Sequence, residues 1–294
     1  MLAVFVVNNF LDVVNGNVAV GSLRNAIELA NANNVHDTII FQDYLFDDPG
    51  SHTIFLSNHM NGGQLELDSI RGVDIIGPGP GILTIVAANN NRIFLIDDGN
   101  EQIGTRVSIS GLTLSGGNPL ANNEGGRGGA ILNRDFLTLT EVDISNNIAP
   151  NGGGGIFSDR GFVTIERSLI RNNISGRGGG GIQNGLRGVE DNLPRTTILN
   201  STITGNTAIG IPLQNGDLTG YGGGVLNFAG TVNIEQSTIY DNTANVVSTA
   251  AALRSAGGGS ATQGFDPEKD DDGAATVFSG FATTNIRSSI LLCN

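Results

Sequence analysis

The sequence has few of the residues on which several classes of protein depend. Among its 294 residues there is one cysteine, Cys293, which excludes a disulfide framework and a zinc site built from several cysteines. Lys269 is the single lysine, and 28 acidic against 15 basic residues give a net charge of −13, which argues against nucleic-acid binding. No apolar run reaches the length of a membrane-spanning helix. We therefore expect neither a nucleic acid nor a membrane span to be part of this protein's function.

The sequence is rich in glycine and contains an internal repeat. Its 44 glycines are roughly twice the usual share. An eleven-residue segment recurs in which positions 1, 3, 6 and 8 are apolar or small and position 11 is asparagine; its copies begin at Leu137, Val163, Thr196, Val232 and Thr284, with a degenerate copy at Val107. A Gly-Gly-Gly-Ile type element precedes most copies, at residues 128–131, 153–156, 179–182 and 222–225. Self-similarity of this kind indicates a stack of equivalent structural units.

The pattern within a copy predicts one coil of a parallel β-helix. Positions 1 and 3 alternate as a strand does, positions 6 and 8 do the same, and the shift between the two pairs marks a bend. The glycine element supplies a third short strand, so each coil has three. We predict one all-β solenoid domain over residues 1–294: a strand and capping helix in 1–35, irregular coils in 36–106, and regular coils in 107–294 with insertions at 183–195, 208–221 and 245–282.

One segment departs from the strand pattern and predicts a short α-helix. Apolar residues follow Ser22 at helical spacing, namely Leu23, Ala26, Ile27 and Ala30, and Ser22 is a plausible N-cap. The first coil of a solenoid leaves its core and strand edges open, so an amphipathic helix there would shield it.

The asparagines at position 11 predict an internal ladder. Asparagine tolerates left-handed backbone angles, and its amide can bond to the equivalent amide of a coil stacked about 4.8 Å away. The glycine triplets permit close turns. A phosphate-binding loop is the alternative interpretation of the triplets, but no lysine follows any of them. The predicted ladder consists of Asn147, Asn173, Asn206, Asn242 and Asn294.

The repeats resemble those of polymorphic outer membrane proteins, which pair a Gly-Gly-Ala-Ile type element with Phe-x-x-Asn. The matching segments here are 128–131 with Ile144-x-x-Asn147, followed by three further pairs in which isoleucine again stands for phenylalanine. Residues 22–27, Ser-Leu-Arg-Asn-Ala-Ile, are similar to the Ser-Leu-Arg-Glu-Ala-Ile motif near the N-terminus of many secreted bacterial β-helix proteins. The resemblance implies a right-handed parallel β-helix with an extracellular or cell-surface location, although no signal peptide is recognised before Asn8.

The sequence does not decide whether the protein is an enzyme, and it favours a non-enzymatic protein. Parallel β-helices include polysaccharide lyases, hydrolases and epimerases, which need acid and base groups on one face. Residues 264–268 resemble the Tyr-Gly-Phe-Asp-Pro-His site of alginate epimerases, but Gln263 and Glu268 stand where that motif has tyrosine and histidine. No catalytic residue and no cofactor-binding residue is therefore assigned.

An acidic stretch in the last insertion is the one candidate for a metal. Asp266, Glu268, Asp270 and Asp272 precede Gly273, as the first ligands of a calcium loop precede its glycine, while the closing glutamate is absent. Calcium binding and a solvated charged loop are the two interpretations of this stretch.

Three functions follow as hypotheses. The first is a non-enzymatic structural, adhesion or scaffold module whose partners are other protein chains or surface polysaccharide. The second is a carbohydrate-active enzyme with its site in the inserted loops, and a groove lined by paired carboxylates and aromatic residues would favour it. The third is an intracellular component of a larger assembly. Because the sequence stops soon after the apolar run 290–292, we also expect that the last coil could associate with a partner strand.

Overall fold

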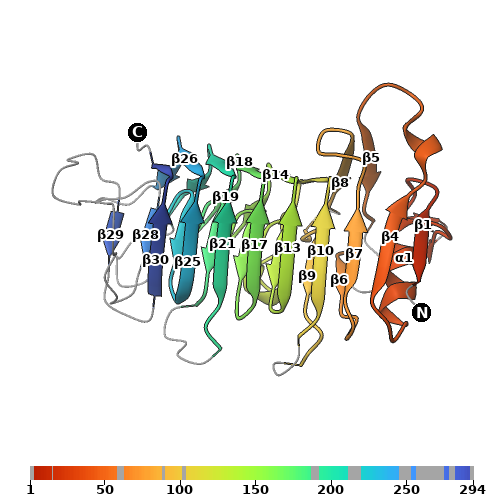
Figure 1. Ribbon diagram of the computed structural model, residues 1–294, viewed down its shortest axis with the longest axis horizontal. Coiled ribbons are helices and arrows are strands. Elements are labelled where there is room, and N and C mark those ends of the chain that lie inside the picture. The colour runs from red at the N-terminus through yellow and green to blue at the C-terminus, as the bar shows by residue number, and fades with distance from the viewer. Residues whose placement is uncertain are drawn as a thin grey trace.

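Successive turns of the chain stack along one long axis, as the computed structural model shows (Figure 1). The coils from β4 (Asp37–Phe41) to β28 (Leu253–Ser255) each contribute one strand to each of three parallel sheets, so that neighbouring strands in a sheet come from consecutive coils. Among the described residues, the first coil contributes only β1 (Val4–Val7) to these sheets, and β28 and β29 (Ala275–Val277) follow each other in the third sheet. The predicted parallel β-helix is therefore confirmed. The structure describes residues 3–14, 16–57, 63–87, 90–100, 104–186, 192–210, 220–244, 253–255, 275–277 and 282–291.

Sheet 1, with nine strands, opens each coil and carries positions 1 to 4 of the repeat in its regular part. Its strands are β1 (Val4–Val7), β4 (Asp37–Phe41), β7 (Val73–Ile76), β10 (Arg106–Ser110), β13 (Phe136–Thr140), β17 (Phe162–Glu166), β21 (Arg195–Leu199), β25 (Gly230–Glu235) and β30 (Ala282–Arg287). The irregular coils before residue 107 belong to the same sheet, because β4 and β7 pair in register with their neighbours.

Sheet 2 follows the first bend and carries positions 7 to 9 of the repeat. Its strands are β5 (His52–Phe55), β8 (Leu83–Val86), β11 (Thr113–Ser115), β14 (Asp143–Ser145), β18 (Leu169–Arg171), β22 (Thr202–Thr204), β26 (Thr238–Tyr240) and β31 (Ile290–Leu291). The bend between sheets 1 and 2 uses a left-handed residue, such as Glu141, Arg167 or Asn200 in the regular coils.

Sheet 3 begins at the hydrophobic residue that ends each glycine element. Its strands are β6 (Leu65–Leu67), β9 (Phe94–Ile96), β12 (Ile131–Asn133), β16 (Ile156–Ser158), β20 (Ile182–Asn184), β24 (Val225–Asn227), β28 (Leu253–Ser255) and β29 (Ala275–Val277). Four regular coils add a two-residue strand between sheets 2 and 3: β15 (Ile148–Ala149), β19 (Ile174–Ser175), β23 (Thr207–Ala208) and β27 (Thr243–Ala244). The coils before residue 107 lack this fourth strand within the described residues.

The core lies inside the three sheets and consists of columns of aliphatic side chains. In sheet 1 one fully buried column runs through Ile75, Ile109, Leu139, Ile165, Ile198 and Ile234, which are paired in register. In the second clear copy, Val163, Ile165, Ser168 and Ile170 are all buried, as the repeat predicts. Each coil therefore buries its apolar positions only by stacking on its neighbours.

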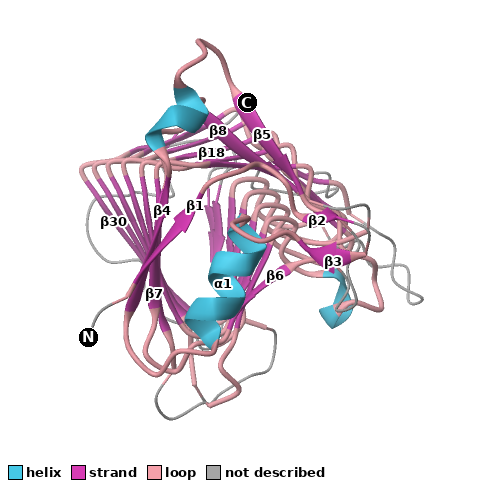
Figure 2. Cartoon of the chain, turned by 90° about the vertical axis from the view of Figure 1, so that its right-hand side faces the viewer, coloured by secondary structure: helices cyan, strands magenta, loops and turns pink. Residues whose placement is uncertain are grey.

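The predicted helix is present and covers the first coil. Helix α1 (Leu23–Asn31) packs against β1, β4 and β6, and Figure 2 shows it lying across the open end of the solenoid. Ser22 is its N-cap, with Oγ accepting a hydrogen bond from the Asn25 backbone N–H at 3.1 Å. The expected apolar face is the buried face. The remaining local elements are the antiparallel pair β2 (Val13–Val14) and β3 (Asn17–Val18) and two 3₁₀ turns, η1 (Asp43–Phe46) and η2 (Glu124–Gly126).

Arg24, in the Ser-Leu-Arg segment, holds this cap on the solenoid. Its guanidinium forms a buried ion pair with Asp12 at 2.8 Å and donates to the backbone carbonyls of Gly63 and Gln64, both at 2.8 Å. A buried charge is tolerated when it is paired and fully hydrogen-bonded. The arginine of this segment therefore has a structural role.

The asparagine ladder is confirmed over the described coils. Each buried amide donates through Nδ2 to the Oδ1 of the next one: Asn147 to Asn173 at 3.0 Å, Asn173 to Asn206 at 2.9 Å, and Asn206 to Asn242 at 2.9 Å. The same oxygens accept the backbone N–H of the preceding asparagine. Asn294, the fifth predicted member, lies outside the described residues.

Two further polar columns run inside the coils. At position 6, Ser168 accepts from Val142 N, and successive serine N–H groups bond to the Oγ of the next coil's serine through Ser201, Ser237 and Ser289. In sheet 3, Asn184 Nδ2 donates to Asn227 Oδ1 at 2.9 Å. The sheet 3 column was not predicted, although asparagine or serine recurs two residues after the isoleucine or valine of each glycine element.

Candidate functional site

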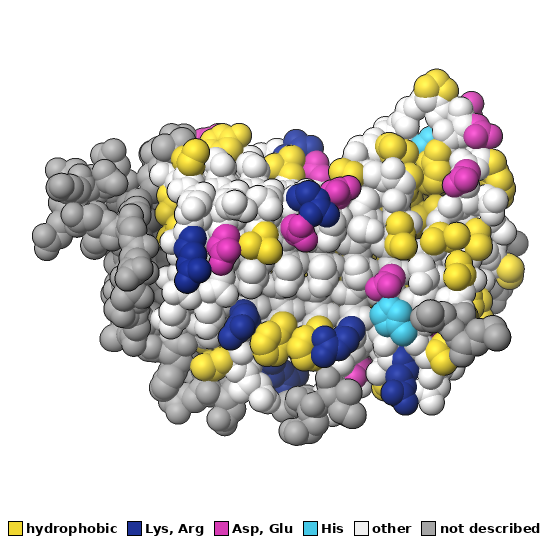
Figure 3. Space-filling view, in the orientation of Figure 1, with side chains coloured by type: hydrophobic (Ala, Val, Ile, Leu, Met, Phe, Trp, Pro, Cys, Tyr) yellow, Lys and Arg dark blue, Asp and Glu magenta, His cyan; other side chains and the backbone are white. Residues whose placement is uncertain are grey.

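The outer face of sheet 1 is the most regular surface of the described protein. Because side chains alternate along a strand, every second residue of sheet 1 points to solvent, and parallel register aligns those residues into rows along the solenoid axis. The middle row carries small polar groups: Ser108, Thr138, Thr164, Thr197, Asn233 and Asn285. In Figure 3 this row forms a pale band along the face.

An aromatic row flanks that band at the edge where the strands begin. Strand pairing places Arg106 beside Phe136, Phe136 beside Phe162, and Phe162 beside Arg195. The two phenylalanine rings stack with centroids 5.0 Å apart and planes 8° apart. We refer to these four residues as the arginine–phenylalanine row, which Figure 3 shows as two hydrophobic residues between two basic ones.

The arginine–phenylalanine row is open to solvent. Phe162 is 43% exposed, and the Arg106 guanidinium lies 4.4 Å from the centroid of the Phe136 ring. Arg106 and Arg195 are exposed, and within the described part of the chain neither forms an ion pair. The two rings and the guanidinium over Phe136 therefore form a small, continuous aromatic surface on the outside of sheet 1.

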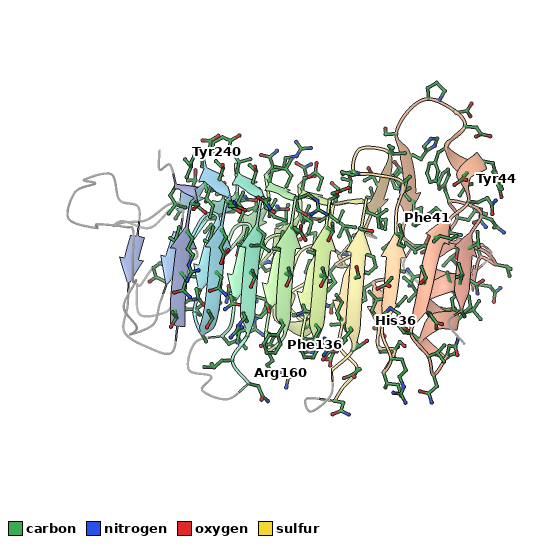
Figure 4. The ribbon with its side chains drawn as sticks, viewed as in Figure 1. His36, Phe41, Tyr44, Phe136, Arg160 and Tyr240 are labelled. Carbon is green, nitrogen blue, oxygen red and sulfur yellow. The ribbon has the colours of Figure 1, made fainter. Side chains whose placement is uncertain are left out.

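A pocket of about 360 Å³ adjoins the two rings. The rings of Phe136 and Phe162 line it, and Asp97, Arg134 and Asp135 contribute its charged side chains together with Arg160. Asn192 and Leu193, from the predicted insertion 183–195, also line it. In Figure 4, Phe136 and Arg160 lie together at the lower edge of sheet 1.

Arg134 organises the carboxylates around the pocket. Its guanidinium contacts Asp97 at 2.8 Å, Glu124 at 2.6 Å and Asp159 at 3.2 Å. Burial acts to lower the pKa of Arg134, but the hydrogen bonds that its guanidinium donates to Asp97 and Glu124 outweigh it and raise that pKa. Arg134 therefore stays charged and fixes three carboxylates from three different coils.

Asp135 is the most perturbed carboxyl of the pocket. Its side chain is buried, and this burial raises its pKa to about 6, with the charges of Asp98 and Asp97 adding to the rise. The Asp98 backbone N–H donates to Asp135 Oδ2 at 2.8 Å and opposes part of that shift. A carboxyl with such a pKa exchanges a proton near neutral pH.

Replacing Asp135 with asparagine should stabilise the fold more at neutral than at acid pH. The folded-state pKa of Asp135 lies above its ordinary value near 4, so the folded protein binds the proton more tightly than the unfolded chain does. Stability from this group is therefore lost as pH rises from about 4 to about 6. We expect the gain in melting temperature of Asp135→Asn over wild type to be larger at pH 7.5 than at pH 4.5.

Thermal melts of both proteins at the two pH values measure this difference. Asp48→Asn, at an exposed carboxylate, is the charge-matched control. A difference between Asp135→Asn and wild type that is the same at both pH values would contradict the assignment.

Only part of this site is predicted from the sequence. The predicted insertion 183–195 supplies Asn192 and Leu193. The aromatic residues of the site, however, lie on strands of sheet 1 and not in the inserted loops, where the sequence places a possible enzyme site. Phe136 and Phe162 occupy the position just before each repeat copy, and aligning the copies one residue earlier would have revealed the row. No group of three or more metal-ligating side chains occurs among the residues that the structure describes. The calcium candidates Asp266, Glu268, Asp270 and Asp272, and the epimerase-like segment 264–268, lie outside those residues.

Fold and site thus define a parallel β-helix with an exposed arginine–phenylalanine row and an adjoining pocket lined by both acidic and basic side chains. No protein-family model and no curated protein sequence matches the chain. A solved structure, ORF18 of Geobacillus virus E2, is similar with a TM-score of 0.39 and 11% sequence identity, and the alignment covers 98% of this chain and 62% of that one. A likeness of this size carries no argument about function. In the described part of the chain, no helix has the length and apolar character needed to cross a membrane.

Proposed function

We propose that the protein is a non-enzymatic adhesion module of the cell surface or extracellular space that binds polysaccharide through the outer face of sheet 1. The observation that carries this proposal is the stack of Phe136 and Phe162, in which Phe136 is half-buried and Phe162 is exposed. Because the rings stack on each other, they present their edges and the outward part of the Phe162 ring to solvent, and this apolar surface can pack against the C–H face of a sugar. A structural or scaffold role alone gives no reason for an apolar surface at this place.

The neighbouring rows supply the other contacts that a glycan needs. The hydroxyls and amides of the middle row, including Thr138 and Thr164, lie beside the rings and can bond to sugar hydroxyls. Both rows run across the same strands of one hydrogen-bonded sheet. The sheet therefore holds these side chains in place before a ligand binds, and binding does not have to order the sheet.

Removing both rings should abolish binding of the polysaccharide. We expect Phe136→Ala/Phe162→Ala to bind at least about tenfold more weakly than wild type, because two stacking contacts are lost. Affinity electrophoresis through gels that contain neutral or acidic polysaccharides measures this effect. Tyr240→Ala is the matched control, since Tyr240 is 39% exposed on sheet 2, away from the row.

Two results of that experiment would contradict the proposal. One is a panel in which no polysaccharide retards the wild-type protein. The other is a polysaccharide that retards the double variant and the wild type equally. Circular dichroism of the variants establishes that each is folded before the gels are compared.

One observation favours the alternative function, a carbohydrate-active enzyme. The pocket beside the rings brings together the carboxyl groups of Asp97 and Asp135, and the raised pKa of Asp135 suits a general acid. Incubating the retained polysaccharide with wild type and with Asp135→Asn, followed by an assay for new reducing ends, separates the two functions. Turnover by wild type that Asp135→Asn loses would establish the enzyme in place of the adhesion module.

A further inference from the structure

The two ends of the arginine–phenylalanine row differ from its centre in charge. Arg106 and Arg195 are exposed, and their guanidinium groups have no carboxylate partner within the described residues. Two neighbouring arginines are paired: Arg167, at the bend between sheets 1 and 2, contacts Glu141 at 3.0 Å, and Arg171 of sheet 2 contacts Asp143 at 2.9 Å. In a chain with a net charge of −13, Arg106 and Arg195 place two such unpaired cations at the two ends of one aromatic platform.

The geometry also sets the size of the ligand. Arg106 and Arg195 stand on strands three coils apart, which is roughly 14 Å at about 4.8 Å for each strand step. An extended ligand that lies along the solenoid axis over both rings would therefore meet a guanidinium at each end. Arg106 is already placed by its contact with the Phe136 ring, 4.4 Å from the centroid.

We propose that the ligand of the arginine–phenylalanine row is an anionic glycan whose acidic groups are bound by Arg106 and Arg195. This inference rests on the proposed function and adds the chemical class of the polysaccharide. Guanidinium groups bind carboxylates and sulfates through paired, charge-assisted hydrogen bonds. The carboxylates of Asp97, in the pocket, and of Asp159, near it, contact Arg134, which reduces their repulsion of such a ligand.

The experiment compares polymers that differ only in charge. Binding of wild type is measured by biolayer interferometry to polygalacturonate and to its fully methyl-esterified form, and to dextran sulfate and dextran, all in EDTA. The first pair tests a carboxylate and the second a sulfate. Arg106→Gln/Arg195→Gln is the test variant. Arg287→Gln, which removes one exposed arginine from another row of the same sheet, is the control and is also compared with each single variant of the pair.

We expect tighter binding to at least one anionic polymer than to its neutral partner, and a loss of roughly tenfold or more in the double glutamine variant. The control should bind as wild type does, and added salt should weaken binding to the anionic polymer. The neutral polymers should bind wild type and the double glutamine variant alike.

Three outcomes would overturn the inference. Equal binding to charged and neutral polymers, unchanged in the double glutamine variant, overturns the charge preference and leaves the aromatic platform in place. Binding to the anionic polymer that appears only when calcium replaces the EDTA assigns recognition to a bridging divalent ion instead of the arginines. An absence of binding to all four polymers overturns this inference, and if the gel panel also fails, the proposed function falls with it.

Discussion

Replacing Asn173 with alanine should lower the free energy of unfolding by about 4 kcal/mol, a large part of the stability of an ordinary domain. The Asn173 amide takes part in four buried hydrogen bonds. Nδ2 donates to the carbonyl of Ile144 and to Asn206 Oδ1, both at 2.9 Å, and Oδ1 accepts from N and Nδ2 of Asn147, both at 3.0 Å. Alanine removes all four of these bonds and leaves the buried Asn147 backbone N–H without its acceptor, and such an unsatisfied group costs about 1–3 kcal/mol.

Chemical denaturation followed by circular dichroism measures this loss. Asn122→Ala is the matched control, because Asn122 is exposed and lies outside the ladder. It should change the stability by less than about 0.5 kcal/mol. An Asn173→Ala protein as stable as the control would show that the ladder contributes little to the fold.

Replacing Gly154 with alanine should destabilise the solenoid by about 3 kcal/mol or more, because the coils can no longer approach each other. A Cβ atom at Gly154 would lie 2.2 Å from the carbonyl oxygen of Gly180 and 2.6 Å from that of Ile174, both on the next coil. These are backbone atoms of the neighbouring coil, which is hydrogen-bonded to this one and cannot move without breaking the stack. The φ angle of Gly154 is not left-handed, so the loss of stability comes from the steric clash alone.

Replacing a second glycine distinguishes the cost of a steric clash from the cost of an unfavourable φ angle. Gly81 has φ +86°, but a Cβ there would meet no atom within 4 Å. Gly81→Ala should therefore lose only about 1 kcal/mol, from the unfavourable φ angle. Equal losses in the two variants, measured by denaturant titration, would contradict the view that the glycine triplets serve close stacking.

The fold was predictable because equivalent positions of every coil have the same surroundings, so the same residue types recur at them. Position 11 must be a small side chain with both a donor and an acceptor, and asparagine meets that requirement at Asn147, Asn173, Asn206 and Asn242. The cap was predictable for a local reason, since Ser22 and the apolar spacing behind it act within one helix. Such patterns involve few residues, so they can be recognised in the sequence without knowledge of distant contacts.

The candidate site was less predictable because it depends on contacts between coils. Asp97, Arg134 and Asp159 are far apart in the sequence and meet only when three coils stack. The perturbed pKa of Asp135 comes from burial in that assembly, and the composition carries no sign of it. Phe136, by contrast, lies one residue before a repeat copy, where a strand of alternating residues must point it outward.

A crystal structure of the protein with an oligosaccharide cut from the most strongly retained polysaccharide tests the central claim most directly. That claim is that the recurring glycine and asparagine residues build the coils, while recognition belongs to the outward rows of sheet 1. We predict electron density for the sugar over Phe136 and Phe162, between Arg106 and Arg195, with the Asn173 amide still buried in its ladder. Density over another surface, with the row left open to solvent, would contradict the account.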